Sequence, residues 1–335
     1  MAAQLRAQLS CDTRNPQYYD RIEVLLFHGW AKTLLGSLPN PRQFANDEDY
    51  NQVLGEKVLA KLRSLPPEHR WDSVLVDEAH TFSQSWFPCC VVALRNPVDG
   101  DLLIVSDGSQ SLYKLRKFTW KAVGINAVGA RSKRLAQNYR NTQEILAAAW
   151  DVLQHTDKTD TDATFPAVEP SAALRSGPKP TIRLTRSKAA AGKAAIEQIT
   201  TLLNSGYSPS DIGILYRWKS KKEENTFNSL LSQLQGIDVD YYWVTENQTT
   251  KRNYDVQRPG IRIITTLSSL GLEFKIVLLL WPEQFWDCQS SDSDKASLAQ
   301  RQLYVAMTRA QDELHLFPSR TLSFLNAQAF EEVST

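Results

Sequence analysis

Two adjacent carboxylates, Asp77 and Glu78, directly follow the apolar residues Val74 to Val76. An acidic pair at the carboxyl end of a buried strand can serve phosphate chemistry, because one carboxylate can hold Mg²⁺ while the other orients a water molecule for attack. The simpler interpretation is a polar cap after a buried strand. Phosphate chemistry would also require groups elsewhere in the chain that hold a nucleotide.

The phosphate-binding loop that usually accompanies such a pair is absent from this sequence. That loop reads G-x-x-x-x-G-K-[ST], so that backbone N–H groups, a lysine and a hydroxyl all meet the phosphates. Gly-Lys occurs once, at Gly192 and Lys193. Ser187 lies five residues before Gly192, and Ala194 follows Lys193. This stretch has the pattern of a helix, so it is not a phosphate-binding loop.

Other polar residues stand at the ends of predicted elements. Gln110 follows a predicted strand at 102–105, and Arg140 lies just before a predicted helix, whose N-terminus favours an anion. Gly271 and Glu273 lie on a turn after a strand, and Arg309 lies near the end of a helix. Each of these residues by itself is equally explained as a surface or turn residue.

The elements that must position these residues alternate between strands and helices. The first half is predicted to contain strands at 22–27, 73–76 and 102–105 and a helix at 141–154, which Asn141 can cap. The second half is predicted to contain strands at 181–185, 211–217, 261–266, 275–281 and 313–317 and helices at 188–204, 226–234 and 294–310. This alternation predicts parallel sheets covered by helices.

The composition changes between residues 156 and 180, which are rich in Thr, Asp, Ala and Pro and have no regular periodicity. This segment is typical of a linker. We therefore expect an α/β domain at 1–155, a linker at 156–180 and a second α/β domain at 181–335.

Charge and composition exclude several classes of protein. The 38 basic and 37 acidic residues give a net charge of +1, so a nucleic-acid site has to be a local patch. The four cysteines have no metal-binding spacing and fit reduced thiols in a cytoplasmic protein. The N-terminus has no apolar signal-peptide core, and the longest apolar run, Ile276 to Trp281, is too short to span a membrane.

Six motifs, taken in order, resemble superfamily 1 helicases of the UvrD/Rep type. The family motifs run roughly TFHSWA, VDEAQDF, GDxxQSIY, NYRS, THSxKGLEF and YVALTRA; this chain has LFHGWA, VDEAHTF, SDGSQSLY, NYRN, TTLSSLGLEF and YVAMTRA. The resemblance extends from Ile22 to Phe317. It implies two tandem RecA-like domains with parallel sheets, the first incomplete at its N-terminus. The letters DEAH could instead suggest superfamily 2, but that group has a QRxGRxGR-like element where this chain has YVAMTRA.

The resemblance implies a role for each matching residue. Asp77 would hold Mg²⁺, Glu78 would polarise the attacking water, and Gln110 would sense the γ-phosphate of ATP. Arg140 in the first domain and Arg309 in the second would contact the γ-phosphate from the two sides of an interdomain cleft. We therefore expect Arg140 to cluster with Asp77, Glu78 and Gln110 at the carboxyl edge of the first sheet.

Three further residues would bind the rest of the nucleotide. Glu273 would bind the ribose, Gly271 would let the backbone approach it, and Tyr139 could stack near the base. Together with Arg309, Gly271 and Glu273 are expected to lie in the second domain, facing the first.

The nucleic-acid contacts depart further from the family pattern. Leu267 and Leu270 replace a histidine and a lysine, and Lys114-Leu115-Arg116 replaces a step whose tryptophan stacks on a DNA base. Basic residues mixed with aromatic ones can still track a single strand. The candidates are His28, Tyr113, Lys114, Arg116 and Trp218, and a solvated basic edge explains them equally well.

Two hypotheses for function follow. In the first, the chain is part of a UvrD-like ATP-dependent DNA helicase that acts on single-stranded or partly duplex DNA with ATP and Mg²⁺, and another chain could supply the missing N-terminal part. In the second, it is a catalytically dead helicase-like module that binds single-stranded nucleic acid or a protein partner. Whether the chain alone is an enzyme is therefore open. Without its opening strand, the first domain should expose an apolar sheet edge or helix face.

Overall fold

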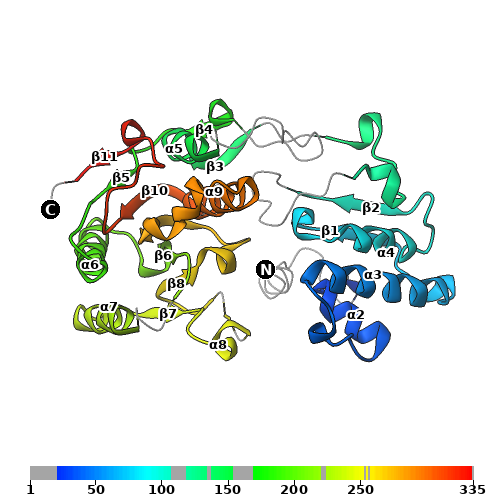
Figure 1. The fold of residues 1–335 in the computed structure, drawn as a ribbon. Helices are drawn as coiled ribbons and strands as arrows, with labels where there is room; N and C mark the ends of the chain where they lie inside the picture. The colour runs from blue at the N-terminus through cyan, green and yellow to red at the C-terminus, as the bar shows by residue number, and fades with distance from the viewer. Residues whose placement is uncertain are drawn as a thin grey trace. The chain divides into compact units, whose positions relative to one another are not determined.

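The computed structural model describes residues 21–106, 118–133, 137–153, 169–219, 224–252, 254–255 and 257–333 (Figure 1). The side chains of residues 248, 252 and 294 lie outside this description. The chain packs as two compact units: among the described residues, an N-terminal unit holds those up to 133 and a C-terminal unit holds those from 137 on. In the described part, no helix combines the length and the apolar character needed to cross a membrane.

A seven-stranded sheet in the order β11-β5-β10-β9-β6-β8-β7 is the centre of the C-terminal unit. Every pairing in it is parallel. Its strands are β5 (Thr181–Ile182), β6 (Ile212–Tyr216), β7 (Tyr241–Trp243), β8 (Ile261–Thr265), β9 (Phe274–Leu280), β10 (Ala310–Phe317) and β11 (Glu331–Glu332). All five residues of β6 are buried, as expected for a central parallel strand that is covered on both faces.

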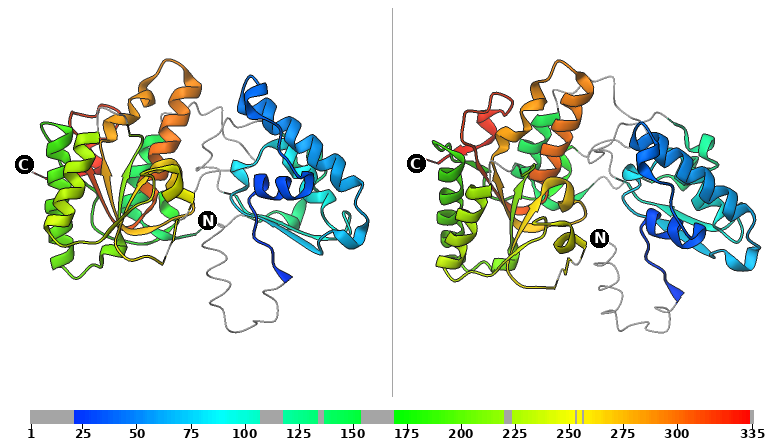
Figure 2. Two further views of the ribbon diagram at one scale, coloured as in Figure 1. Left: turned by 90° about the horizontal axis from the view of Figure 1, so that it is seen from below. Right: turned by 60° about the horizontal axis from the view of Figure 1, so that its bottom comes forward.

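Helices cover both faces of this sheet (Figure 2). α6 (Lys188–Asn204) and α7 (Glu224–Gly236) pack on one face, and α5 (Gln143–Leu153) and α9 (Ser293–Thr308) on the other. The short helix α8 (Gln248–Arg252) follows β7. This three-layer arrangement confirms the predicted α/β fold class with a parallel sheet for this unit.

Local sequence explains where the long helices begin. The Ser187 hydroxyl accepts a hydrogen bond from Ala190 N at 3.1 Å at the start of α6. Gly192 and Lys193 lie inside this helix, which confirms that they do not form a phosphate-binding loop. Gly213 in β6 allows a close approach, since a Cβ there would come within 2.6 Å of the Phe274 ring at the start of β9.

A small parallel sheet, β3 (Asn138–Thr142) with β4 (Ala173–Arg175), lies beside α5 in the C-terminal unit. The expected domain boundary at 155 was therefore wrong, because residues 138–153 belong to the C-terminal unit. Part of the expected linker was also wrong, since 173–175 form a strand. The sequence pattern missed both because each strand is short and pairs with a partner distant in the sequence.

The N-terminal unit contains the helices α2 (Phe27–Leu35), α3 (Asp47–Arg63) and α4 (Phe87–Val92) and the parallel strands β1 (Ser73–Val76) and β2 (Asp101–Ile104). The expected strand at 22–27 was wrong, because residues 22–26 are irregular and Phe27 begins α2. The sequence analysis also missed α3. Its signal is Asn46, whose side chain accepts a hydrogen bond from Asp49 N at 2.9 Å.

One face of the β1–β2 sheet is apolar and exposed. Leu75 is paired with Leu103 in the register, and both are exposed, as is Val105 just beyond β2. The opposite face is covered, with Val76 in a core that includes Phe87 of α4. An apolar surface is exposed in this unit, but it is a sheet face and not the sheet edge or helix face that was expected.

Candidate nucleotide and nucleic-acid sites

Arg140 and Glu273 form an ion pair in the C-terminal unit. Arg140 lies in β3, and Glu273 immediately precedes β9. Both side chains are partly exposed. The other carboxylate oxygen of Glu273 accepts a hydrogen bond from the Gln311 amide at 2.9 Å. The pair therefore lies at the amino edge of the seven-stranded sheet, where a charged ligand could compete for either partner.

Arg309 is only 1 % exposed and lies beside this pair. It stands between α9 and β10, and its guanidinium donates to the carbonyls of Val305 and Leu272, each at 3.2 Å. Leu272 directly precedes Glu273, so Arg309 and Arg140 approach the same short segment. In this conformation the Arg309 guanidinium faces the protein interior.

Asn141 holds the backbone on both sides of Arg309. Its buried side-chain amide donates to the carbonyl of Thr308 at 2.9 Å and to that of Ala310 at 2.5 Å. These bonds tie β3, which carries Arg140, to the turn that carries Arg309.

The expectation that Asn141 caps α5 was wrong, because α5 begins at Gln143 and the Asn141 side-chain oxygen accepts from the Asn138 amide at 3.1 Å. Ile145 N donates instead to the Thr142 hydroxyl at 3.4 Å.

Gly271 and Tyr139 are the other two candidate residues near Arg140, Glu273 and Arg309 at the amino edge of the sheet. Gly271 has a φ of 74°, a conformation that suits glycine in the turn before Leu272. Tyr139, next to Arg140, is exposed, and its hydroxyl bonds to the side chain of Gln137. The residues expected to bind base and ribose thus lie next to the arginines rather than scattered over the fold.

Residues 133–253 match the UvrD-like helicase C-terminal domain. The resemblance that the motifs indicated is confirmed for this part of the chain. The matched residues include Arg140. The expectation that Arg140 belongs to the first domain was wrong, because β3 pairs with β4 and contacts β10 in the C-terminal unit.

One solved structure similar to this chain is the C-terminal domain of a possible DNA helicase from Lactobacillus plantarum WCFS1. It is 20 % identical, covers 58 % of this chain and 98 % of that one, and has a TM-score of 0.39. No curated protein sequence matches the chain.

The acidic pair lies at the carboxyl end of β1 in the N-terminal unit. Asp77 is exposed, and its Oδ1 accepts a hydrogen bond from Glu78 N at 2.9 Å. Glu78 has a φ of 51°, unusual for a residue with a side chain, and its carboxylate lies 3.4 Å from Nδ1 of buried His80. A strained backbone at a strand end is a frequent property of functional sites.

A separate exposed aromatic residue, Trp218, follows β6 at the carboxyl edge of the seven-stranded sheet. The preceding Arg217 is largely buried; burial lowers its pKa, and the neighbouring carboxylate of Asp287 opposes that effect. Trp286, which is also exposed, lies in the segment after β9 at the same edge. Sequence reasoning missed Trp286, although its position after a predicted strand was a usable signal.

The remaining candidates divide between the surface and the undescribed parts of the chain. His28 lies in α2, where its ring stacks on Tyr50 at 5.9 Å between ring centroids, and partial burial lowers its pKa. The other four candidates lie outside the described residues, and they are Gln110, Tyr113, Lys114 and Arg116.

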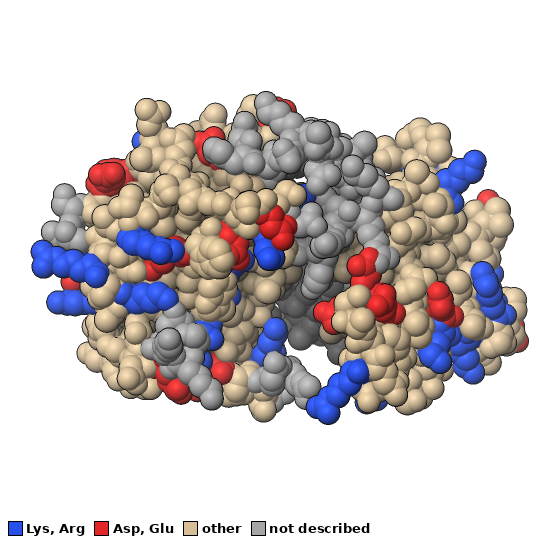
Figure 3. All heavy atoms as spheres, in the orientation of Figure 1, with Lys and Arg blue, Asp and Glu red and all other residues tan. Residues whose placement is uncertain are grey.

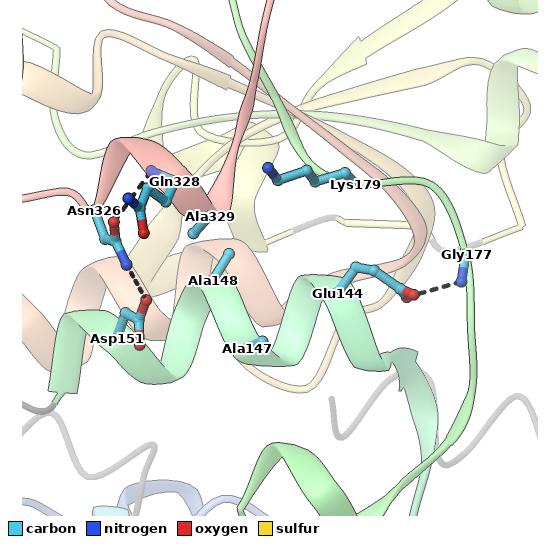
Figure 4. Close-up of a pocket in the computed structure, with 9 residues that line it drawn as sticks. All are labelled: Glu144, Ala147, Ala148, Asp151, Gly177, Lys179, Asn326, Gln328 and Ala329. Atoms are coloured by element: carbon cyan, nitrogen blue, oxygen red, sulfur yellow. Dashed lines mark hydrogen bonds between the residues drawn. The ribbon is translucent and has the colours of Figure 1, made fainter.

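Charged side chains do not form a large single-sign surface on the face shown in Figure 3, where basic and acidic residues are interspersed. The structure also has a pocket of about 490 Å³ along α5, lined by Ala147, Ala148 and Ala329 among others. Figure 4 shows hydrogen bonds between lining residues, from Gly177 N to Glu144 and from Asn326 to Asp151, and Lys179 takes part in neither. The lining includes neither the tryptophans Trp218 and Trp286 nor the arginines Arg140 and Arg309.

Proposed function

We propose that the chain is part of a UvrD-like ATP-dependent DNA helicase, in which ATP hydrolysis is coupled to movement along a DNA strand. The observation that carries the proposal is the convergence of Arg140, Glu273 and Arg309 on the segment at Leu272. Two arginines beside a ribose-binding carboxylate can neutralise the charge that develops during phosphoryl transfer.

The Arg140–Glu273 pair is suited to exchange its partner. Ion pairs between exposed side chains contribute only about 0–1 kcal/mol, so a phosphate oxygen can displace the carboxylate at little cost. Glu273 would then be released to accept hydrogen bonds from a ribose. Arg309 would have to leave the carbonyls of Val305 and Leu272 to reach a phosphate, so the proposal includes a rearrangement at this turn.

ATP would bring most of the ligands for Mg²⁺. Within the described ranges, no group of three or more His, Cys, Asp or Glu could hold a metal ion. Mg²⁺ commonly binds one or two protein carboxylates together with phosphate oxygens and water, and the exposed Asp77 fits that limited part. The ion would supply charge neutralisation, and Glu78 would orient the water.

The chain by itself should hydrolyse no ATP. Its sequence has no G-x-x-x-x-G-K-[ST], so the phosphates lose a nest of backbone N–H donors and a lysine. Removing even one preorganised donor from an active site commonly costs about a hundredfold or more in rate.

Phosphate release with saturating Mg-ATP, with and without single-stranded DNA, tests this expectation, and Glu78→Gln is the control. Wild type and variant should both give background rates. A DNA-stimulated rate that Glu78→Gln abolishes would overturn the proposal of inactivity. Binding of a fluorescent ATP analogue should be weaker in Arg140→Ala, and unchanged binding would argue against the amino-edge site.

A second candidate function is binding of single-stranded nucleic acid without hydrolysis. The exposed Trp218 at the carboxyl edge favours it, because base stacking on aromatic side chains needs no nucleotide. Fluorescence anisotropy of a labelled oligothymidylate, measured without ATP, tests this function. No binding at low salt would exclude it.

A further inference from the structure

We infer that Trp218, held in place by Arg217, is a stacking platform for one unpaired base of a single-stranded nucleic acid. The inference rests on the nucleic-acid binding just proposed, and it adds the chemical group that is bound and the residue that positions the platform. It is carried by the packing, hydrogen bonding and exposure of these two side chains.

Arg217 underlies the exposed indole. Its Cζ lies 4.5 Å from the centroid of the Trp218 ring and 5.1 Å from that of Phe285. Phe285 is fully buried, whereas Trp218 is 39 % exposed. The guanidinium therefore contacts both a buried ring and a partly open indole, and the indole is the one that a ligand can reach.

The guanidinium is fixed by three partners of different types. Nε donates to the Gln302 side chain at 2.9 Å, Nη1 to the Gln284 carbonyl at 2.6 Å, and Nη2 to the Asp287 carboxylate at 3.0 Å. Its side chain is only 10 % exposed. Arg217 therefore has little freedom to turn away from the indole, and it is a positioning residue rather than a free phosphate ligand.

The backbone of Trp218 is fixed as well. Trp218 N donates to the Gln284 side-chain oxygen at 3.3 Å, and the Gln284 side-chain amide donates to the Trp218 carbonyl at 2.9 Å. A platform that is already ordered loses little conformational entropy when a ligand binds. An ordinary surface tryptophan would lack both this pair of backbone hydrogen bonds and the cation beneath its ring.

A nucleobase is the ligand that this chemistry fits. A flat base stacks on an indole face, and a cation near the same ring strengthens such contacts. The positive charge of Arg217 is already offset by Asp287. The platform should therefore contribute stacking and not counterion release, which depends on lysines or arginines that neutralise phosphates.

Two neighbours extend the surface along the same edge. Trp286 is one residue beyond Phe285 and is 57 % exposed, so a second ring is available for stacking. Lys219 is exposed, and its Nζ lies 4.3 Å from the centroid of the Trp243 ring. A lysine next to the platform can neutralise a phosphate of the same strand.

Anisotropy with a labelled oligothymidylate of about 20 nucleotides, and with an abasic strand of equal length, tests the platform. Trp218→Ala should weaken binding to oligothymidylate by about 5- to 150-fold, and Trp218→Phe should retain most of the affinity. Neither change should alter binding to the abasic strand, which has phosphates but no bases. Ile237→Ala, similarly exposed at 37 % in the same unit, is the matched control and should bind like wild type.

Arg217→Lys tests the positioning role, because lysine keeps the charge but loses the three-way hydrogen bonding. It should weaken binding to oligothymidylate, leave the abasic strand unaffected, and add little further loss in Trp218→Ala. Thermal melting of every variant checks that the fold is intact.

The outcomes separate the two ideas. If wild type binds neither strand, the proposed nucleic-acid function fails. If wild type binds oligothymidylate and Trp218→Ala binds it equally well, or loses both strands equally, the stacking platform is overturned while the binding function stands.

Discussion

The guanidinium of Arg140 pairs with the carboxylate of Glu273, although the first belongs to a short strand before α5 and the second to the turn before β9. The buried amide of Asn141, the next residue after Arg140, holds the backbone around Arg309. The expected nucleotide-binding residues of the second domain are thus joined to an arginine that the sequence pattern had assigned to the first. These contacts should contribute differently to the free energy of unfolding, and the differences can be measured.

Arg140 and Arg309 should differ sharply in their contribution to stability. Arg140→Ala removes a partly exposed ion pair and should change the free energy of unfolding by less than about 1 kcal/mol. Arg309→Ala removes a buried side chain and two hydrogen bonds to carbonyls, so it should cost about 2 kcal/mol or more. Urea unfolding of both variants makes the comparison. Equal small losses would mean that Arg309 is not buried in solution.

Asn141→Ala should destabilise the C-terminal unit by about 1–3 kcal/mol, because the carbonyls of Thr308 and Ala310 lose a buried donor. Asn228→Ala is the control, since Asn228 is exposed on α7 of the same unit and its truncation should have a small effect. The midpoints of urea unfolding give both values. A similar loss in the two variants would contradict the bridging role of Asn141.

Glu313 should make the stability of the C-terminal unit depend on acid pH. The hydrogen bond with His315, followed by that from Tyr207, lowers the pKa of Glu313 below its ordinary 4.5. The native state therefore favours the ionised form, which stabilises the fold above the unfolded pKa. That contribution is lost as the pH falls through the lowered native pKa.

The measurement is the free energy of unfolding from neutral pH down to about pH 4 and below, for wild type and Glu313→Gln. The glutamine variant should show a shallower decline over this range, since it has no carboxylate to protonate. Parallel curves would show that Glu313 does not have a lowered pKa in the native state.

The exposed face of the β1–β2 sheet should cause self-association. Leu75→Ser together with Leu103→Ser should reduce it without lowering the melting temperature, since both side chains already face solvent. Light scattering and thermal melting measure the two effects. Val76→Ser is the contrasting variant, because Val76 is buried in the core with Phe87. A hydroxyl at this position should lower the melting temperature of the protein. A large loss of melting temperature in the leucine variants would mean that the face is covered in solution.

The sequence by itself determined the elements whose signals are local. The apolar runs of β1, β6, β8 and β9, the acidic pair after β1 and the helical pattern that ends at Arg309 all follow from periodicity and end residues within a few positions. Tertiary structure decided what depends on distant partners. The bridge from the Asn141 amide to the carbonyls of Thr308 and Ala310 forms only because β3 packs against β10. Arg140 and Trp218 likewise have local sequences typical of surface residues. Arg140 lies beside Glu273 because β3 contacts β10, the neighbour of β9. Arg217 is held against Trp218 by Gln302, Gln284 and Asp287, which lie more than 60 residues later in the chain, and no local pattern records that proximity.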